Sequence, residues 1–209
     1  MDIRTLPIEA DKFYHIYNRG INGEIIFKSE RNYDFFIQKL NQYLTQVADI
    51  YAYCLLPNHF HLLVKIKSLN ELTSLVKVLN LDKAASKGLH SPRNIFSKQF
   101  SKIFNSYTQA FNKENKRHGA LIESPFKRKA ISSEEYLKNV IIYIHRNPQS
   151  HDLIDNFREY KYSSYGKILN HAENLIHVNK LIKLFDDKEN FISSHNKETD
   201  YNPCQGLEP

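Results

Sequence analysis

A pair of histidines separated by one phenylalanine is the feature of this sequence most suited to chemistry. Polar and apolar residues alternate over His59–Ile66, which is typical of a β-strand. Successive side chains of a strand point to opposite sides, so His59 and His61 share one side while Phe60 points to the other. Two such positions are about 7 Å apart, within reach of one ion. The pattern predicts two metal ligands, and the alternative is a pair of half-buried histidines beside a turn.

A tyrosine and an asparagine are spaced to lie on one face of a helix. Tyr143 and Asn147 are four residues apart in a segment whose apolar residues recur with helical period. This helix is expected to begin at a capping box, Ser132 to Glu135, and to end at Asn147 because Pro148 follows. A phenol beside a neutral oxygen ligand suits a metal-assisted tyrosine nucleophile. The alternative is a core tyrosine beside an asparagine that ends the helix.

Strands and helices must hold these residues in place, and the sequence indicates where they lie. Alternating or short apolar runs bounded by turn residues predict strands, and apolar residues at three-and-four spacing predict helices. The order of these elements predicts an α+β fold in which helices cover an antiparallel sheet. Strands are expected within 14–19, 50–56, 59–66 and 120–131, helices within 31–48, 69–80, 96–118, 132–147, 160–169 and 175–185, and a polar, partly disordered tail over 186–209.

Cysteine content and hydropathy exclude several classes of protein. The two cysteines, Cys54 and Cys204, are too few for a disulfide framework or a cysteine-based zinc site. No stretch of eighteen apolar residues occurs, and the first residues lack the apolar core of an export signal. We therefore expect a cytoplasmic protein that neither spans a membrane nor is exported.

Positive charge is concentrated in one part of the chain. Residues 83–129 carry 11 of the 29 lysines and arginines but only two carboxylates, Glu114 and Glu123. Such a block favours a polyanionic partner, because cations placed against phosphates release condensed counterions. The alternative is a solvated helix face, and charge alone does not separate the two interpretations.

Three segments, taken together and in this order, resemble a known family. They read YHIYNRG over 14–20, LPNHFHLLV over 56–64 and YIHRNP over 143–148. They resemble the single-tyrosine HUH transposases, of the insertion-sequence-200 type, and within these the REP-associated tyrosine transposases. The resemblance covers roughly Phe13 to Leu169, and Gln149 departs from the aliphatic residue usual after Asn-Pro.

The resemblance implies a fold and a division of the chain. The expected fold is an antiparallel sheet of four or five strands, of the ferredoxin-like or RNA-recognition-motif (RRM-like) kind, covered by helices. A single catalytic domain is expected over 1–169. A helical extension and a polar tail are expected over 170–209.

The resemblance also implies an activity on single-stranded or hairpin DNA. Tyr143 matches the nucleophile that attacks a phosphodiester and leaves a 5′-phosphotyrosine and a free 3′-hydroxyl. His59 and His61 match the two histidine ligands of Mg²⁺ or Mn²⁺, and Asn147 matches the third ligand. For contacts with DNA the candidates are cations and aromatic residues that stack on unpaired bases: Tyr14, His15, Tyr17, Arg19, Lys65, Arg93, Lys98, Lys102, Phe126, Lys127, Arg128 and Arg146.

Two other functions remain open at this point. One is a catalytically silent relative that binds DNA or RNA hairpins, although all four expected site residues are present. The other is a replication initiator or relaxase, which shares the histidine pair but usually belongs to a longer chain. The sequence leaves open the target DNA and whether the protein acts as a monomer or a homodimer.

Overall fold

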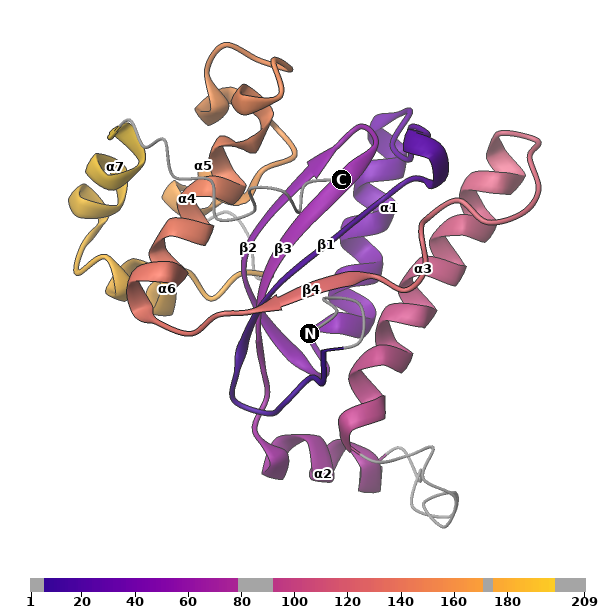
Figure 1. The fold of residues 1–209 in the computed structure, drawn as a ribbon, viewed down its shortest axis with the longest axis horizontal. Coiled ribbons are helices and arrows are strands. Elements are labelled where there is room, and N and C mark those ends of the chain that lie inside the picture. The colour runs from indigo at the N-terminus through magenta and orange to yellow at the C-terminus, as the bar shows by residue number, and fades with distance from the viewer. Residues whose placement is uncertain (1–5, 79–91, 171–174, 198–209) are drawn as a thin grey trace.

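The computed structural model describes residues 6–78, 92–170 and 175–197. Over these residues the chain forms one antiparallel sheet with the strand order β2-β3-β1-β4 (Figure 1). The central strands pair so that Tyr17 lies opposite His61 and Arg19 opposite His59. The strands are β1 (Phe13–Arg19), β2 (Ala48–Leu56), β3 (His59–Ile66) and β4 (Lys127–Ala130).

Alternation along each strand divides the side chains between two faces. Phe60 points to one face, where its ring centroid lies 5.1 Å from that of Phe36 and 5.8 Å from that of Phe104. His59 and His61 point to the other face, which we call the histidine face. The first layer of helices, which covers the Phe60 face, contains α1 (Glu30–Lys39), a π-helical turn (Leu40–Leu44) and α3 (Pro92–Glu114). Helix α2 (Leu69–Val78) follows β3 and packs against α3.

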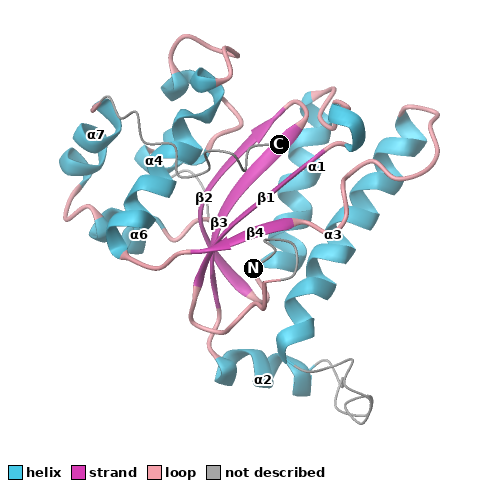
Figure 2. Cartoon of the chain, in the orientation of Figure 1, coloured by secondary structure: helices cyan, strands magenta, loops and turns pink. Residues whose placement is uncertain are grey.

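A second layer of helices covers the histidine face. Helix α4 packs on β2 and β3, and Figures 1 and 2 show it on the side of the sheet opposite α1 and α3. Segments after α4 follow the outer edge of β2, where the amide of Leu55 donates to the carbonyl of Tyr162 over 3.0 Å. This layer contains α4 (Glu134–Ser150), a 3-10 turn (Phe157–Glu159), α5 (Ser164–Leu169), α6 (Val178–Leu184) and α7 (Lys188–Asn196).

The end of β1 requires a glycine. A Cβ atom at Gly20 would lie 2.0 Å from the carbonyl oxygen of Glu24, which leaves no space for any side chain. The amide of Gly20 donates to the carbonyl of Asn58 over 2.8 Å, which ties this turn to the β2–β3 hairpin. The glycine therefore allows the chain to turn back closely beside the histidines.

The predicted α+β sheet covered by helices is confirmed, whereas several boundaries were wrong. Helix α4 is capped by Ser133, whose hydroxyl accepts from the amide of Tyr136, so the expected capping box at Ser132 does not form. The helix also continues through Pro148 to Ser150. Proline removes one hydrogen bond to the preceding turn, and the amide of His151 still donates to Asn147, so the last turn persists.

Within the tail that was predicted to be partly disordered, Lys188–Asn196 forms α7. Its Phe191 and His195 are fully buried, and this burial stabilises a helix that composition alone does not predict. The helix predicted over 31–48 ends at Leu44, and the one predicted over 160–169 begins only at Ser164. Among the described residues, no helix is long and apolar enough to cross a membrane.

Candidate active site

The histidine pair lies at the start of β3, directly after the hairpin turn. His61 is fully buried and His59 is 5% exposed, and their ring centroids lie 5.2 Å apart. Nδ1 of His59 lies 2.7 Å from Oδ1 of Asn58, an oxygen that only accepts, so Nδ1 carries the ring proton. The basic nitrogen of His59 is therefore Nε2.

A third histidine, from β1, supports His61. Nε2 of His15 lies 3.0 Å from Nδ1 of His61, and both rings are fully buried. The rings stack with centroids 5.1 Å apart, and the ring of Tyr17 stacks beside them. If Nε2 of His61 binds a cation, its Nδ1 donates to His15, as ligand histidines usually do to a neighbouring acceptor. His15 therefore orients His61 and, with a cation on Nε2, would hold the proton of His61 on Nδ1.

Burial keeps the imidazole rings of His61 and His15 neutral. It lowers the pKa of His61 well below its ordinary value, and His15, His59 and His151 lower it further. Burial, with a smaller contribution from Lys129, lowers the pKa of His15 to about 3. A neutral imidazole has a lone pair available for a metal ion, whereas an imidazolium has none.

Tyr143 contacts the histidine pair from α4, which covers the histidine face of the sheet. Its ring meets that of His61 edge to face, with centroids 5.5 Å apart and planes at 87°. A similar contact of 6.0 Å joins it to His15. The side chain is 9% exposed. Helix α4 and strand β3 therefore bring together the phenol and the imidazole that the sequence analysis identified separately.

Asn147 lies between Tyr143 of α4 and His151, the residue that caps the C-terminal end of α4, and both of these contact the histidine pair. Tyr143, one turn before it, contacts His61, and His151, one turn after it, has its ring centroid 4.9 Å from that of His59. Asn147 is fully buried, and its spacing from Tyr143 and His151 places it on their side of the helix.

The buried side chains of Asn147 and His61 have polar atoms that form no hydrogen bond with the described residues. Within the described parts of the chain, no group forms a hydrogen bond with Oδ1 or Nδ2 of Asn147 or with Nε2 of His61. A buried polar group without a partner is costly, so these atoms indicate a site for an external ligand. An imidazole nitrogen and an amide oxygen are both ligands that a divalent cation accepts. The residues present therefore fit a metal ion.

We expect that replacing His15 weakens metal binding at His61. In His15→Phe the ring volume is kept but the acceptor for Nδ1 of His61 is lost, so the affinity for Mn²⁺ should fall about tenfold. His15→Gln, which supplies an acceptor oxygen, should recover most of that affinity. Titration of free Mn²⁺ by electron paramagnetic resonance in the DNA-free protein measures both. Equal affinity in the wild type and the phenylalanine variant would show that His15 only fills space.

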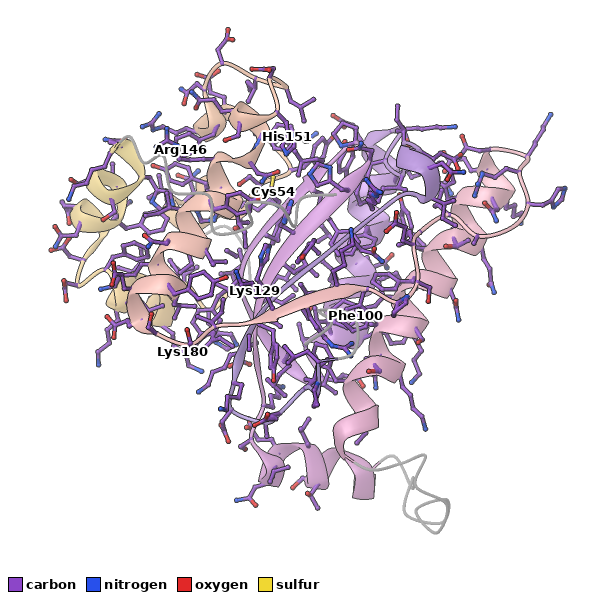
Figure 3. The ribbon with its side chains drawn as sticks, in the orientation of Figure 1. Cys54, Phe100, Lys129, Arg146, His151 and Lys180 are labelled. Carbon is purple, nitrogen blue, oxygen red and sulfur yellow. The ribbon has the colours of Figure 1, made fainter. Side chains whose placement is uncertain are left out.

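Two of the cations predicted to contact DNA, Arg19 and Lys127, lie on the histidine face beside the candidate site, together with Lys129, which was not predicted. Lys127 pairs with Tyr17 and Lys129 with His15 across β1 and β4, so both lie on the side of the sheet where the imidazoles lie. Arg19 lies opposite His59, and its Nε donates to Glu123 over 2.7 Å. These cations flank the candidate site on its β4 side, and Figure 3 labels Lys129 there.

The other cations predicted to contact DNA lie away from the histidine pair. Lys98 and Lys102 belong to α3 in the opposite layer, where Phe100 is labelled in Figure 3. Arg146 points toward α7 and donates to the carbonyl of Lys197 over 2.7 Å. Lys65 shares the histidine face but lies over the ring of Phe13, toward the other end of β3. Arg128 lies on the Phe60 face over the ring of Phe126, and the side chain of Arg93 is outside the described residues.

The structure does not support base stacking by the four rings predicted to contact DNA, those of three aromatic residues and one histidine. Tyr14, His15, Tyr17 and Phe126 are each at most 7% exposed. A ring that is covered on both sides offers no face to an unpaired base. His15 and Tyr17 instead pack beside His61, and the hydroxyl of Tyr14 donates to the carbonyl of Pro7 over 3.1 Å.

Sequence reasoning missed His151. It lies four residues after Asn147 and thus one turn further along the same helix face, so the spacing alone could have found it. It was missed because Pro148 was expected to end the helix. Figure 3 shows His151 labelled at the end of α4, and it lies against His59.

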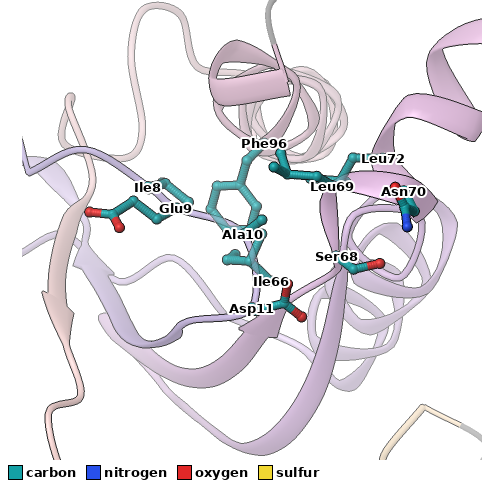
Figure 4. Close-up of a pocket in the computed structure, with 10 residues that line it drawn as sticks. All are labelled: Ile8, Glu9, Ala10, Asp11, Ile66, Ser68, Leu69, Asn70, Leu72 and Phe96. Atoms are coloured by element: carbon teal, nitrogen blue, oxygen red, sulfur yellow. The ribbon is translucent and has the colours of Figure 1, made fainter.

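A separate pocket lies at the far end of the sheet. Its lining includes Ile8, Ile66, Leu69 and Phe96, and Figure 4 shows these residues together. Ile66 ends β3 seven residues after His59, about 23 Å along the strand. This pocket is therefore distinct from the candidate site.

No protein-family model matches the sequence, and no curated protein matches it. A solved structure of the REP-associated tyrosine transposase bound to a REP hairpin is similar to the chain with a TM-score of 0.59 and 14% identity. The alignment covers 85% of this chain and 89% of that one.

A structure of a bacterial tRNA(His) guanylyltransferase-like protein in complex with GTP has a TM-score of only 0.42 at 9% identity. That alignment covers 74% of this chain and 73% of the other. The four-stranded antiparallel sheet, its helices and the coverage of the first alignment agree with the resemblance found in the sequence motifs. The chain has the fold of the REP-associated tyrosine transposase.

Proposed function

We propose that the protein nicks and rejoins single-stranded DNA that carries a hairpin, with Tyr143 as the nucleophile. The observation that carries this proposal is the edge-to-face contact of 5.5 Å between Tyr143 on α4 and His61 on β3. These residues are 82 positions apart in the sequence and belong to different layers. A tyrosine beside a buried histidine pair has the components of metal-assisted attack on a phosphodiester.

His59, His61 and Asn147 would hold the divalent cation, Mg²⁺ or Mn²⁺. Among the described residues, no group of three or more histidines, cysteines, aspartates or glutamates is placed to hold a metal, so Asn147 is the third protein ligand in this proposal. Three neutral ligands leave room for phosphate oxygens and water, as an open catalytic site requires. When bound, the cation would polarise the scissile phosphate and offset the charge that develops on its oxygens.

The proposed reaction exchanges one phosphoester bond for another. The phenol oxygen of Tyr143 forms a bond to phosphorus, and the bond from phosphorus to the 3′-oxygen of the preceding nucleotide breaks. The phenol loses its proton, and the departing oxygen takes one up as a free 3′-hydroxyl. The 5′-phosphotyrosine retains an activated phosphoester, so attack by a 3′-hydroxyl restores the strand without ATP. This balance suits strand transfer better than digestion of DNA.

The DNA strand is proposed to cross the β1 and β4 side of the histidine face. Arg19, Lys127 and Lys129 lie there, next to Tyr17 and His15 in the register. Glu123 contacts both Arg19 and Lys127, so phosphate would compete with one carboxylate for two cations. The similar solved structure is of a protein bound to a REP hairpin, which supports a hairpin as the probe.

A covalent adduct tests the proposal directly. The full-length protein is incubated with Mn²⁺ and synthetic single strands that contain a hairpin and unpaired flanks, and intact mass is measured under denaturing conditions. We expect a species heavier by the 3′ portion of the strand, absent when EDTA is added. Tight binding without an adduct, over a panel of hairpins and flanks, would instead favour the catalytically silent hairpin-binding protein.

A further inference from the structure

A chain of buried polar groups connects α7 to α4, α5 and β2. Nε2 of His195 lies 2.8 Å from Nδ1 of His145, and Nε2 of His145 lies 2.8 Å from Oγ of Ser164. The chain begins at the carbonyl of Phe191, 2.7 Å from Nδ1 of His195, and ends at the amide of Tyr53, 2.9 Å from Oγ of Ser164. His145, Ser164 and His195 are fully buried.

One arrangement of protons satisfies every group in this chain. Burial lowers the pKa of His195 to about 4, so its ring carries one proton at neutral pH. The carbonyl of Phe191 only accepts, so the proton of His195 is on Nδ1 and its Nε2 accepts from Nδ1 of His145. Nε2 of His145 then accepts from the hydroxyl of Ser164, whose oxygen accepts from the amide of Tyr53. Each group uses the donor and acceptor required by its neighbour.

A serine next to two histidines also resembles a catalytic triad with a serine nucleophile. In this protein, however, the serine is not accessible to a substrate. Ser164 has no exposed surface, and its oxygen is occupied by the backbone amide of β2. The rings of Phe191 and Tyr165 pack against His195, with centroids 4.2 and 5.1 Å away. A substrate has no path to this hydroxyl, so the chain of bonds joins elements of the fold.

His145 connects this chain of hydrogen bonds to the side of α4 that faces away from the candidate site. It lies two residues after Tyr143 and two before Asn147, which puts it about 200° around the helix from each. The next residue, Arg146, donates to the carbonyl of Lys197 at the end of α7. Arg158, which follows α4, donates to Asn196 at the same end. The segment of α4 that carries the proposed nucleophile and ligand is therefore the segment bound to α7.

We propose that His195 positions Tyr143 and Asn147 by fixing the rotation and height of α4 over the sheet through His145. This inference rests on the proposed function for its consequence in catalysis, whereas the positioning itself concerns the fold alone. Apolar packing tolerates a small rotation of a helix, because many orientations bury similar area. A directional polar chain in the core does not, because any rotation leaves buried groups without partners.

The positioning is tested first without DNA or metal. In His195→Phe the acceptor is lost and Nδ1 of His145 has no partner, so amide hydrogen exchange in α4 should become faster. His195→Gln, whose amide oxygen reaches about as far as Nε2, should keep the exchange slow. The matched control is Phe185→Leu, which disturbs the same aromatic cluster without touching the polar chain. Exchange in α4 that is no faster in His195→Phe than in Phe185→Leu would overturn the proposal.

The consequence for the site is tested by the rate of adduct formation. A displacement of Tyr143 by about 1 Å should slow this rate about 100-fold in His195→Phe. Affinity for the same hairpin strand should stay within a few-fold, and His195→Gln should recover the rate. If His195→Phe reacts as fast as the wild type, α7 does not position the nucleophile.

The two proposals fail in different ways. If the wild type forms no adduct with any strand, the proposed function fails, and hydrogen exchange still decides whether His195 positions α4. If His195→Phe does not fold, Ser164→Ala replaces it, because it removes the donor to His145 with little change in volume. Slow exchange in α4 of that variant, equal to the wild type, would overturn the positioning.

Discussion

Tyr143→Phe should abolish the covalent adduct while the protein still binds hairpin DNA. The substitution removes only the hydroxyl, so the ring keeps its edge-to-face contacts with His61 and His15 and the fold should be unchanged. Without the oxygen no phosphotyrosine can form, and we expect the yield to fall about 1,000-fold or more. Intact mass under denaturing conditions measures the adduct, and fluorescence anisotropy of a labelled strand measures binding.

Tyr136→Phe is the matched control for this prediction. Tyr136 lies seven residues before Tyr143 on the same side of α4 and is half-buried, with Nζ of Lys129 5.2 Å from its ring centroid. Its adduct yield should equal that of the wild type. An adduct that persists in Tyr143→Phe and disappears in Tyr136→Phe would move the nucleophile to Tyr136. An adduct that persists in both would show that neither tyrosine is the nucleophile.

His61→Ala should remove the metal dependence of the reaction. The variant loses a buried nitrogen for which the described residues supply no partner, and the affinity for Mn²⁺ should fall about 100-fold or more, beyond the loss expected from a supporting residue. Adduct formation should fall below detection at Mn²⁺ concentrations that saturate the wild type. Isothermal titration of Mn²⁺ into the DNA-free protein gives the affinity independently of the reaction.

The control for His61→Ala must account for damage to the core. Leu63→Ala removes a fully buried side chain from the same face of β3, two residues further along, and should cost about 2 to 5 kcal/mol of stability. If the folded fraction is matched by circular dichroism, Leu63→Ala should bind Mn²⁺ as the wild type does. Cleavage by His61→Ala at the wild-type rate in excess Mn²⁺ would contradict a role as ligand.

Much of the candidate site follows from local periodicity. Alternation in β3 places His59 and His61 on one side and Phe60 on the other, as the ring contacts of Phe60 with the first helical layer show. Helical spacing likewise places Tyr143 and Asn147 on one face of α4. Both relations hold inside a single element, where backbone geometry fixes the direction of each side chain.

The DNA contacts could not be sorted by the same reasoning. The basic block contains Lys98 and Lys102 as well as Lys127 and Lys129, and the four have equal weight in a charge count. In the structure only the pair on β4 shares the face of the histidines, because α3 covers the opposite side of the sheet. Which face of the sheet a helix covers depends on packing between elements distant in sequence. The spacing of the lysines does not indicate which of them will share the face of the histidines.

Three histidines outside the predicted metal ligands show most clearly the difference between what the sequence and what the tertiary structure determine. His15 has the alternation of an ordinary strand residue, His151 lies beyond a proline, and His195 lies in a segment whose composition is typical of disorder. Each acquires its contact only when another element is packed against it: β3 against β1, α4 against β3, and α7 against α4. The sequence by itself determined the kinds of element, the residues each presents together and the resemblance in its motifs. The tertiary structure alone decided which of these faces meet, because hydrogen bonds and ring contacts between distant segments depend on the packing of the whole chain.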